Sequence, residues 1–265
     1  MILVEFLTGL MSMLKAHKKG VLNIKIGIIG ASGTLGSALT NTLPGAVVIN
    51  RIVDDSLLKK NFDIIFVCAP GGMKWYANQN PEHDIAEVDR LISLLSTLRT
   101  NRFIVFSTID TLSSDNEQEN RYGAHRKKLE DYILSNRIGS IVRLGVLVGP
   151  FIKKNFIYDL KAKETAFTPN PKSSFQFSNL FEWEDLINLI IKNEFLIFNY
   201  FSSSLTFEYI VNNLIGLNLI SNSTNKIVTY NHSNTNDDKS LALFNEKSNT
   251  TATCLKVIQK YIENY

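Results

Sequence analysis

The stretch I-G-I-I-G-A-S-G-T-L-G-S-A-L, residues 26–39, decides the fold of this chain. An apolar, β-branched run comes first, glycines then recur at Gly30, Gly33 and Gly36, and a segment with helical apolar spacing follows. A strand, a glycine-rich turn and a helix in this order are typical of the first unit of an α/β protein. Three missing side chains so close together indicate that something approaches the backbone there.

The same rhythm continues to about residue 150. Short apolar runs alternate with longer segments of helical spacing, which is typical of βαβ units. The apolar runs are continuous, so both faces of the sheet should be covered by helices. We predict an α/β fold, a Rossmann-type doubly wound parallel sheet. The predicted strands are 24–29, 46–49, 63–68, 103–107 and 140–147, and the predicted helices are 34–43, 84–98 and 122–135.

Beyond Gly149-Pro150 the rhythm loosens, which predicts a small C-terminal substrate lobe. We divide the chain into an N-terminal extension (1–21), a Rossmann domain (22–150), and the smaller lobe with a C-terminal helix (151–265). Residues 221–250 are rich in Asn, Ser and Thr and are predicted to hold a loop. The predicted elements of the lobe are strands 175–177 and 196–200 and helices 183–192, 206–214 and 252–261.

The composition argues against several classes of protein. Of the 265 residues, 45% are hydrophobic, enough for a substantial core. Lys plus Arg number 28 against 25 for Asp plus Glu, and they are scattered, so we expect no nucleic-acid partner. No run reaches the length of a membrane span, and two distant cysteines fit a reducing compartment. We expect a cytoplasmic protein without membrane contact.

The glycine turn predicts a dinucleotide site. Amides at a helix N-terminus point at phosphates, and a Cβ would keep the backbone and a pyrophosphate apart. The alternative is a tight turn that is packed for its own sake. The residues we assign to cofactor binding here are Gly30, Ser32, Gly33, Thr34, Leu35 and Gly36.

The second strand ends in V-V-I-N-R, close to where the adenosine ribose of a dinucleotide would lie. An acidic residue there would accept from the ribose hydroxyls, whereas Asn50 and Arg51 offer donors and a positive charge. We therefore expect NADP in preference to NAD. The alternatives are that Arg51 is simply solvated, or that Asp54 or Asp55 folds back to the ribose.

Five motifs in order resemble the extended short-chain dehydrogenase/reductases, in particular the nucleotide-sugar epimerases, dehydratases and reductases. They are G-A-S-G-T-L-G, F-D-I-I-F-V-C-A-P-G-G, F-S-T-I-D-T, Y-G-A-H-R-K-K-L-E and V-R-L-G-V-L-V-G-P, and S-S-F-Q-F-S-N-L-F-E-W-E-D-L resembles a later element over the substrate. The resemblance covers roughly residues 22–220. It implies hydride transfer at the carbon of a nucleotide-activated sugar, of the kind used for cell-surface polysaccharides.

The resemblance also implies roles for residues. Tyr122 matches the acid–base tyrosine, Thr108 the hydroxyl that donates to the substrate oxygen, and Arg126 stands where the family has a lysine. By the same resemblance, Cys68, Ala69 and Pro70 line the cofactor, and Asp110, Lys154, Asn155 and Gln176 contact the substrate. No His or Cys spacing predicts a metal site.

Two departures from the family pattern leave the activity open. Arginine has a bulkier, planar head than lysine, and Leu112 stands where many relatives have tyrosine. One reading is therefore an enzyme, and the alternative is a catalytically degenerate NAD(P)-binding sensor or partner protein. An isoflavone-reductase-like or NmrA-like protein is a third reading. Relatives often form homodimers through the helices that correspond to 84–98 and 122–135.

Overall fold

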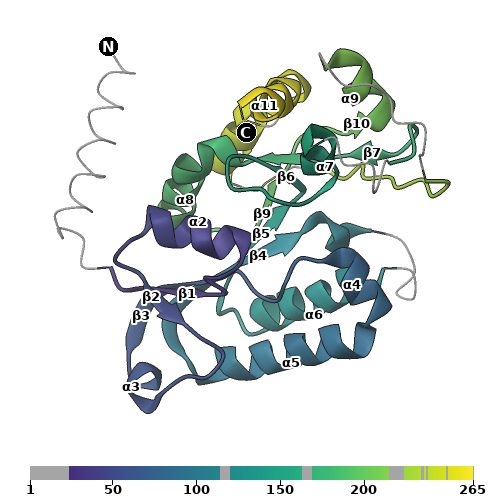
Figure 1. Ribbon diagram of the computed structural model, residues 1–265. Coiled ribbons are helices and arrows are strands. Elements are labelled where there is room, and N and C mark those ends of the chain that lie inside the picture. Colours follow the sequence, from purple (N-terminus) through teal and green to yellow (C-terminus); the bar gives the residue numbers. More distant parts are fainter. Residues whose placement is uncertain are drawn as a thin grey trace, which may run out of the picture.

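The computed structural model describes residues 24–113, 120–162, 169–214, 224–233, 236, 238–248 and 250–264. A six-stranded sheet with the order β2-β1-β3-β4-β5-β9 lies at its centre, and every pair of neighbouring strands is parallel (Figure 1). The strands are β1 (Ile26–Ile29), β2 (Val47–Ile49), β3 (Asn61–Val67), β4 (Arg99–Thr108), β5 (Gly139–Leu144) and β9 (Ile197–Tyr200). The predicted fold class is confirmed.

Helices cover both faces of the sheet. Helices α2 (Thr34–Thr42) and α8 (Trp183–Lys192) pack on one face, and α5 (Pro81–Thr97) and α6 (Arg121–Ser135) pack on the other. In β3, Phe66 joins the apolar cluster on the first face and Ile65 joins the cluster on the second. Because side chains of a strand alternate between faces, two covered faces require the continuous apolar runs of this sequence.

The direction in which strands are added to the sheet reverses at β1. The chain runs from β1 to β2 on one side and later to β3 on the other side of β1. Ligands of open α/β sheets bind at such a reversal, at the carboxyl ends of the strands. In the described part of the chain no strand lies outside β2, which is therefore the sheet edge, and the short helix α3 (Asp55–Leu58) leads on to β3.

The C-terminal part forms a third apolar cluster around two small sheets. Strand β6 (Val146–Val148) pairs with β8 (Phe177–Asn179), and β7 (Ser174–Phe175) pairs with β10 (Leu205–Thr206). The helices around them are α7 (Phe156–Ala162), α9 (Phe207–Asn213) and α11 (Thr251–Asn264). The chain beyond residue 150 also supplies α8 and β9 to the main sheet, and the division into domains stays a prediction.

Several details differ from the predicted elements; helices α3 and α7, for example, were not predicted. The predicted strand 140–147 is two strands, because the chain leaves the main sheet at Gly145, where a Cβ would lie 2.2 Å from the Gln176 carbonyl oxygen. Helix α4 (Lys74–Gln79) was not predicted, and the predicted loop 221–250 contains α10 (Lys239–Ser248). The extension 1–21 lies outside the described residues. None of the helices described has the length and apolar character of a membrane span.

Candidate functional site

The turn after β1 requires glycine at its first position. Gly30 has a positive φ of 81°, in the left-handed region that other residues rarely adopt. A Cβ on Gly30 would also come within 2.9 Å of the Cys68 carbonyl group. Cys68 follows β3, so the chain segments after β1 and β3 touch at the carboxyl ends of their strands.

The other two glycines of the turn differ in what surrounds them. A Cβ on Gly36 would lie 2.0 Å from the Gly30 carbonyl oxygen, so Gly36 is needed for helix α2 to pack on the turn. A Cβ on Gly33 would lie 3.4 Å from the same oxygen, which is ordinary van der Waals contact. The packing of the turn therefore explains why residues 30 and 36 are glycines. At position 33 the packing leaves room for a side chain, so it does not explain the glycine there.

Gly33 is the N-cap of α2, and the helix end is suited to an anion. No side chain caps this end, and the first turn of α2 contains no acidic residue. Gly33 and its neighbour Ser32 are exposed, and Thr34 and Leu35 begin the helix. Uncapped amides and the positive end of the helix dipole together favour a phosphate.

Asn50 and Arg51 follow β2 and are both exposed. The Arg51 side chain is 79% exposed and lies 3.2 Å from a carboxylate oxygen of Glu87. Asp54 caps α3 instead of folding back, since its Oδ1 accepts from the Leu57 amide at 2.8 Å. A positive charge is thus accessible at the end of β2.

Cys68, Ala69 and Pro70 follow β3 and are half-buried beside the glycine turn. The Cys68 amide donates to the Ile29 carbonyl oxygen at 2.9 Å, which continues the pairing of β1 with β3. The segment predicted to line the cofactor therefore lies next to the segment predicted to bind its phosphates.

Tyr122 and Arg126 lie together near the start of α6. The Arg126 guanidinium carbon lies 4.4 Å from the centre of the Tyr122 ring. Its two terminal nitrogens donate to the two oxygens of Asp84, each at 2.9 Å, and one of them also donates to the Gly71 carbonyl oxygen at 2.8 Å. Arg126 is buried. Its charge is matched by the Asp84 carboxylate, and both terminal nitrogens have hydrogen-bond partners within the protein.

The pKa of Tyr122 depends on burial and on neighbouring charges. Burial raises the pKa of Tyr122 above its ordinary value of 10.0, and the charge of Arg126 opposes that rise. The carboxylates of Asp110 and Asp84 raise the pKa further. The acid–base role of Tyr122 stays a prediction.

Thr108 and Asp110, after β4, belong to a hydrogen-bonded cluster with two residues that the sequence did not indicate. The Thr108 hydroxyl donates to Asp110 Oδ2 at 2.8 Å. Lys74 Nζ and the Tyr230 hydroxyl both donate to Asp110 Oδ1 at 2.5 Å, and Lys74 Nζ also donates to the Tyr230 oxygen at 2.9 Å. Asp110 and Tyr230 are buried, whereas the Lys74 side chain is 39% exposed.

No motif in the sequence marks Lys74, Tyr230 or Asp84. Asp84 is 42 residues from Arg126, and Tyr230 is 120 residues from Asp110. For Lys74 there was one weak signal. It follows the P-G-G segment at residues 70–72, and glycine and proline there mark the loop at the end of a strand, where site residues are often found.

The remaining predicted substrate residues have different surroundings. Lys154 is exposed, and Asn155 donates to the Leu147 carbonyl oxygen and accepts from the first amides of α7. The buried Gln176 donates to the carbonyl oxygens of Ser202 and His232 and accepts from the His232 amide. Asn155 and Gln176 thus hold the backbone in place, and their contact with a substrate stays a prediction.

A buried ion pair supports the end of β4. Glu130 is fully buried and accepts from Arg143 Nε and Nη2, the shorter contact being 2.6 Å. The hydroxyls of Ser107 and Thr111 donate to the same carboxylate at 2.6 and 3.1 Å. The residues on either side of Thr108 and Asp110 are thereby fixed to α6 and β5.

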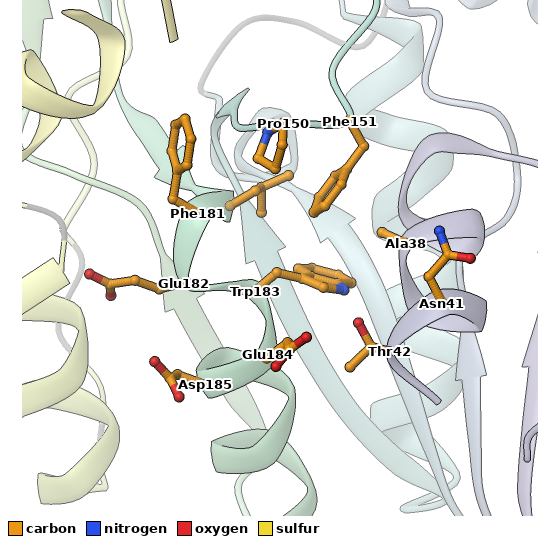
Figure 2. A pocket seen from close by; sticks show the side chains of 11 residues that line it. Ala38, Asn41, Thr42, Pro150, Phe151, Phe181, Glu182, Trp183, Glu184 and Asp185 are labelled. Carbon is orange, nitrogen blue, oxygen red and sulfur yellow. The ribbon is translucent and has the colours of Figure 1, made fainter. Parts of the chain in front are cut away.

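A cavity of about 400 Å³ lies elsewhere, between α2, the segment after β6 and the start of α8 (Figure 2). It is lined by Asn41 and Thr42 from the C-terminal half of α2, and by Phe151, Trp183 and Glu184. No residue of the cluster around Asp110 lines this cavity, which is therefore a separate feature. No group of His, Cys, Asp and Glu side chains among the described residues could hold a metal ion.

No family model and no curated protein matches the sequence. Solved structures match the fold. One is a UDP-galactose 4-epimerase, with 16% identity, a TM-score of 0.61, and coverage of 91% of this chain and 98% of that chain. WbmG of Bordetella bronchiseptica, solved with NAD and UDP, has 14% identity, a TM-score of 0.63, and coverage of 91% and 94%. RMD of Pseudomonas aeruginosa, solved with NADPH, has 15% identity, a TM-score of 0.61, and coverage of 91% and 100%.

These likenesses extend over nearly the whole length of the matched chains. Identities of 14–16% are evidence for the fold alone. They confirm that the chain has the fold of the extended short-chain dehydrogenase/reductases that its motifs resemble.

Proposed function

We propose that this protein binds a nicotinamide dinucleotide, NADP in preference to NAD, and uses it to oxidise, reduce or epimerise a carbon of a nucleotide-activated sugar. The observation that carries the proposal is the uncapped N-terminus of α2 beside Gly33, at the reversal of strand order next to β1. A pyrophosphate supplies the negative charge that this helix end lacks.

The cofactor choice rests on Arg51. Its side chain is largely exposed at the end of β2, where a 2′-phosphate would be held. The matched structures include one solved with NAD and one solved with NADPH, so they support a nicotinamide cofactor of either kind.

The substrate class rests on the fold and on the groups at the ends of β3 and β4. The matched proteins include a UDP-galactose epimerase, and WbmG was solved with UDP. In this chain the Tyr122 phenol and the Thr108 hydroxyl are the two groups proposed to contact the reacting oxygen of the sugar. The bound cofactor would supply hydride transfer, and the Tyr122 hydroxyl is proposed to hydrogen-bond to that oxygen and to exchange a proton with it.

Two measurements test the proposal. NADPH and NADH are titrated into the protein by fluorescence, and binding of neither would refute it. A panel of nucleotide sugars is then followed by nicotinamide absorbance for net redox change and by NMR for epimerisation, because an epimerase returns its hydride and shows no net change. Binding with turnover of a nucleotide sugar is the expected result.

A second candidate function is a dinucleotide-binding sensor without catalysis. The observation that favours it is the pairing of Arg126 with Asp84, which engages the guanidinium that stands in the place of the family lysine. Tight binding of NADPH with no conversion of any sugar in the panel would support the sensor over the enzyme.

A further inference from the structure

The P-G-G segment at residues 70–72 passes beside the hydroxyl group of Tyr122. It joins β3 to α4, and both of its glycines, Gly71 and Gly72, are exposed. A Cβ on Gly72 would lie 3.8 Å from the Tyr122 hydroxyl oxygen, and no other described atom beyond its chain neighbours would come within 4 Å of it. A side chain at position 72 would therefore begin next to the group to which we assign the proton exchange.

The structure of the protein does not require a glycine at position 72. Gly30 is the one described glycine with a positive φ, so Gly72 does not adopt the left-handed conformation that favours glycine. A contact of 3.8 Å is an ordinary van der Waals distance, so an alanine would fit there without moving Tyr122. Glycine also loses more conformational entropy on folding than alanine does. Neither the backbone nor the packing of the described residues explains the missing side chain.

Two hydrogen bonds hold this segment against α6, one on each side of Gly72. The Gly71 carbonyl oxygen accepts from a terminal nitrogen of Arg126 at 2.8 Å. On the other side, Asn78 of α4 accepts through its Oδ1 from the Tyr122 amide at 2.8 Å. Because Tyr122 and Arg126 are both on α6, these bonds fix position 72 relative to the Tyr122 hydroxyl. The space beside that hydroxyl therefore has a defined size.

Resting on the proposed function, we propose that Gly72 is a specificity-determining residue, whose bare backbone leaves room for the sugar ring that presents its oxygen to Tyr122. To form a hydrogen bond, the sugar oxygen comes within about 2.5–3.0 Å of the tyrosine oxygen. The ring carbon one bond further out then needs the same shell of space around the hydroxyl as a Cβ on Gly72 would. The substrate class that needs this room is a secondary alcohol in a ring, because its carbon carries two further ring atoms.

Gly72→Val is the decisive variant. Its branched side chain extends from the Cβ position into the space beside the Tyr122 hydroxyl and reduces the room for the sugar ring. We expect kcat/KM for the nucleotide sugar to fall about tenfold or more, since one methylene in a pocket is worth about 10- to 200-fold. Gly72→Ala should cause a smaller fall in the same direction. The affinity for NADPH and the unfolding midpoint should stay the same, because the added Cβ displaces no described atom.

Gly71→Val and Gly45→Val are the matched controls. Both glycines are exposed, and a Cβ on either would have no described atom beyond its chain neighbours within 4 Å. Gly71→Val puts the same side chain into the same segment but farther from Tyr122, so it tests whether a stiffer segment alone lowers the rate. Gly45→Val makes the same change in the turn between α2 and β2. Both controls should keep the wild-type kcat/KM.

A double-mutant cycle with Tyr122→Phe adds a readout that a purely structural role of Gly72 would not move. If Gly72 acts through the space at the Tyr122 hydroxyl, both substitutions disturb one contact with the substrate. Gly72→Val should then lower kcat/KM by a smaller factor in the Tyr122→Phe protein than in the wild type. Equal factors in the two backgrounds would contradict the role of Gly72.

The outcomes separate the role of Gly72 from the proposed function. If the wild-type protein binds NADPH but neither binds nor converts any nucleotide sugar of the panel, the proposed function fails, and the role of Gly72 fails with it. If a sugar binds without conversion, Gly72→Val should raise the Kd of that sugar, measured by calorimetry, and an unchanged Kd would overturn the role.

If the wild-type protein converts a nucleotide sugar and Gly72→Val keeps its kcat/KM, the role of Gly72 alone is wrong. It is also wrong if Gly71→Val costs as much as Gly72→Val, or if Gly72→Val loses affinity for NADPH and nothing else. Circular dichroism and the unfolding midpoint show whether each variant is folded. Should Gly72→Val fail to fold, Gly72→Ala takes its place, and an unchanged kcat/KM of that variant overturns the role.

Discussion

Arg126, which lies over the ring of Tyr122, forms a bidentate ion pair with Asp84, with both N–O distances at 2.9 Å. Arg126 stands in the position of a family lysine, but its positive charge is already paired with the Asp84 carboxylate. Burial raises the pKa of Tyr122, the guanidinium over its ring opposes that rise, and the Asp84 carboxylate adds to it.

Removing Asp84 should destabilise the fold. In Asp84→Asn the buried guanidinium of Arg126 keeps its charge and loses its carboxylate, and breaking one partner of a buried pair costs about 3–5 kcal/mol. Denaturant unfolding measures this loss. Asp89→Asn, at an exposed partner of Lys128, is the matched control and should change stability by less than about 1 kcal/mol. Equal effects of the two variants would contradict the prediction.

The contribution of Asp84 should also depend on pH. Burial acts to raise the pKa of Asp84, but hydrogen bonds and charge from Arg126 and His125 lower it below the ordinary value of 3.8. A lowered folded-state pKa gives stability that is present above the unfolded value and is lost as the pH falls through the folded value. The difference in unfolding free energy between wild type and Asp84→Asn should therefore narrow below about pH 4. A constant difference from pH 7 to pH 2 would disprove this.

An added methyl group should affect stability at Gly36 and cofactor affinity at Gly33. Gly36→Ala places a Cβ within 2.0 Å of a backbone oxygen, so it should lower the unfolding midpoint strongly. Gly33→Ala meets only ordinary contact, so it should fold normally but bind NADPH more weakly. Thermal unfolding and NADPH titration of both variants check this. A destabilised Gly33→Ala protein, or one with unchanged affinity, would count against the phosphate-binding role of the turn.

Arg51 should decide between the two cofactors. Arg51→Ala removes an exposed positive charge at the end of β2, and we expect about a tenfold loss of affinity for NADPH, with little change for NADH. Lys59→Ala, an exposed lysine near the end of α3, controls for the general loss of charge. A parallel loss for both cofactors would assign Arg51 to the shared part of the dinucleotide.

Tyr122 should ionise only at high pH, and its removal should lower the rate of turnover. Because its pKa is raised, the ultraviolet titration of the folded protein should show a tyrosine that ionises above pH 10 and is missing in Tyr122→Phe. Turnover in Tyr122→Phe should fall about 10²-fold, the typical cost of one lost donor to the reacting oxygen, with NADPH affinity retained. Full activity of that variant would remove Tyr122 from the site.

Local signals in the sequence were sufficient for the glycine turn and for most of the sheet. The predicted helix 183–192 matches α8 residue for residue, because strong apolar periodicity follows a buried strand and turn. The helix of Tyr122 and Arg126 was predicted to within one residue of its start. Helix α4 was missed because its six residues carry too few apolar positions for a period to be recognised.

The sequence by itself determined the alternation of the main strands and helices up to about residue 150, the glycine turn, and the elements that carry Tyr122, Thr108 and Arg126. Each of these depends on neighbours within one or two turns of chain. Only the tertiary structure decided their chemistry. Asp84 reaches Arg126 from another helix, and Lys74 and Tyr230 reach Asp110 across 36 and 120 residues of chain. The charge state of a buried group depends on the partners that folding brings within hydrogen-bond distance, and no local pattern encodes which distant residues those are.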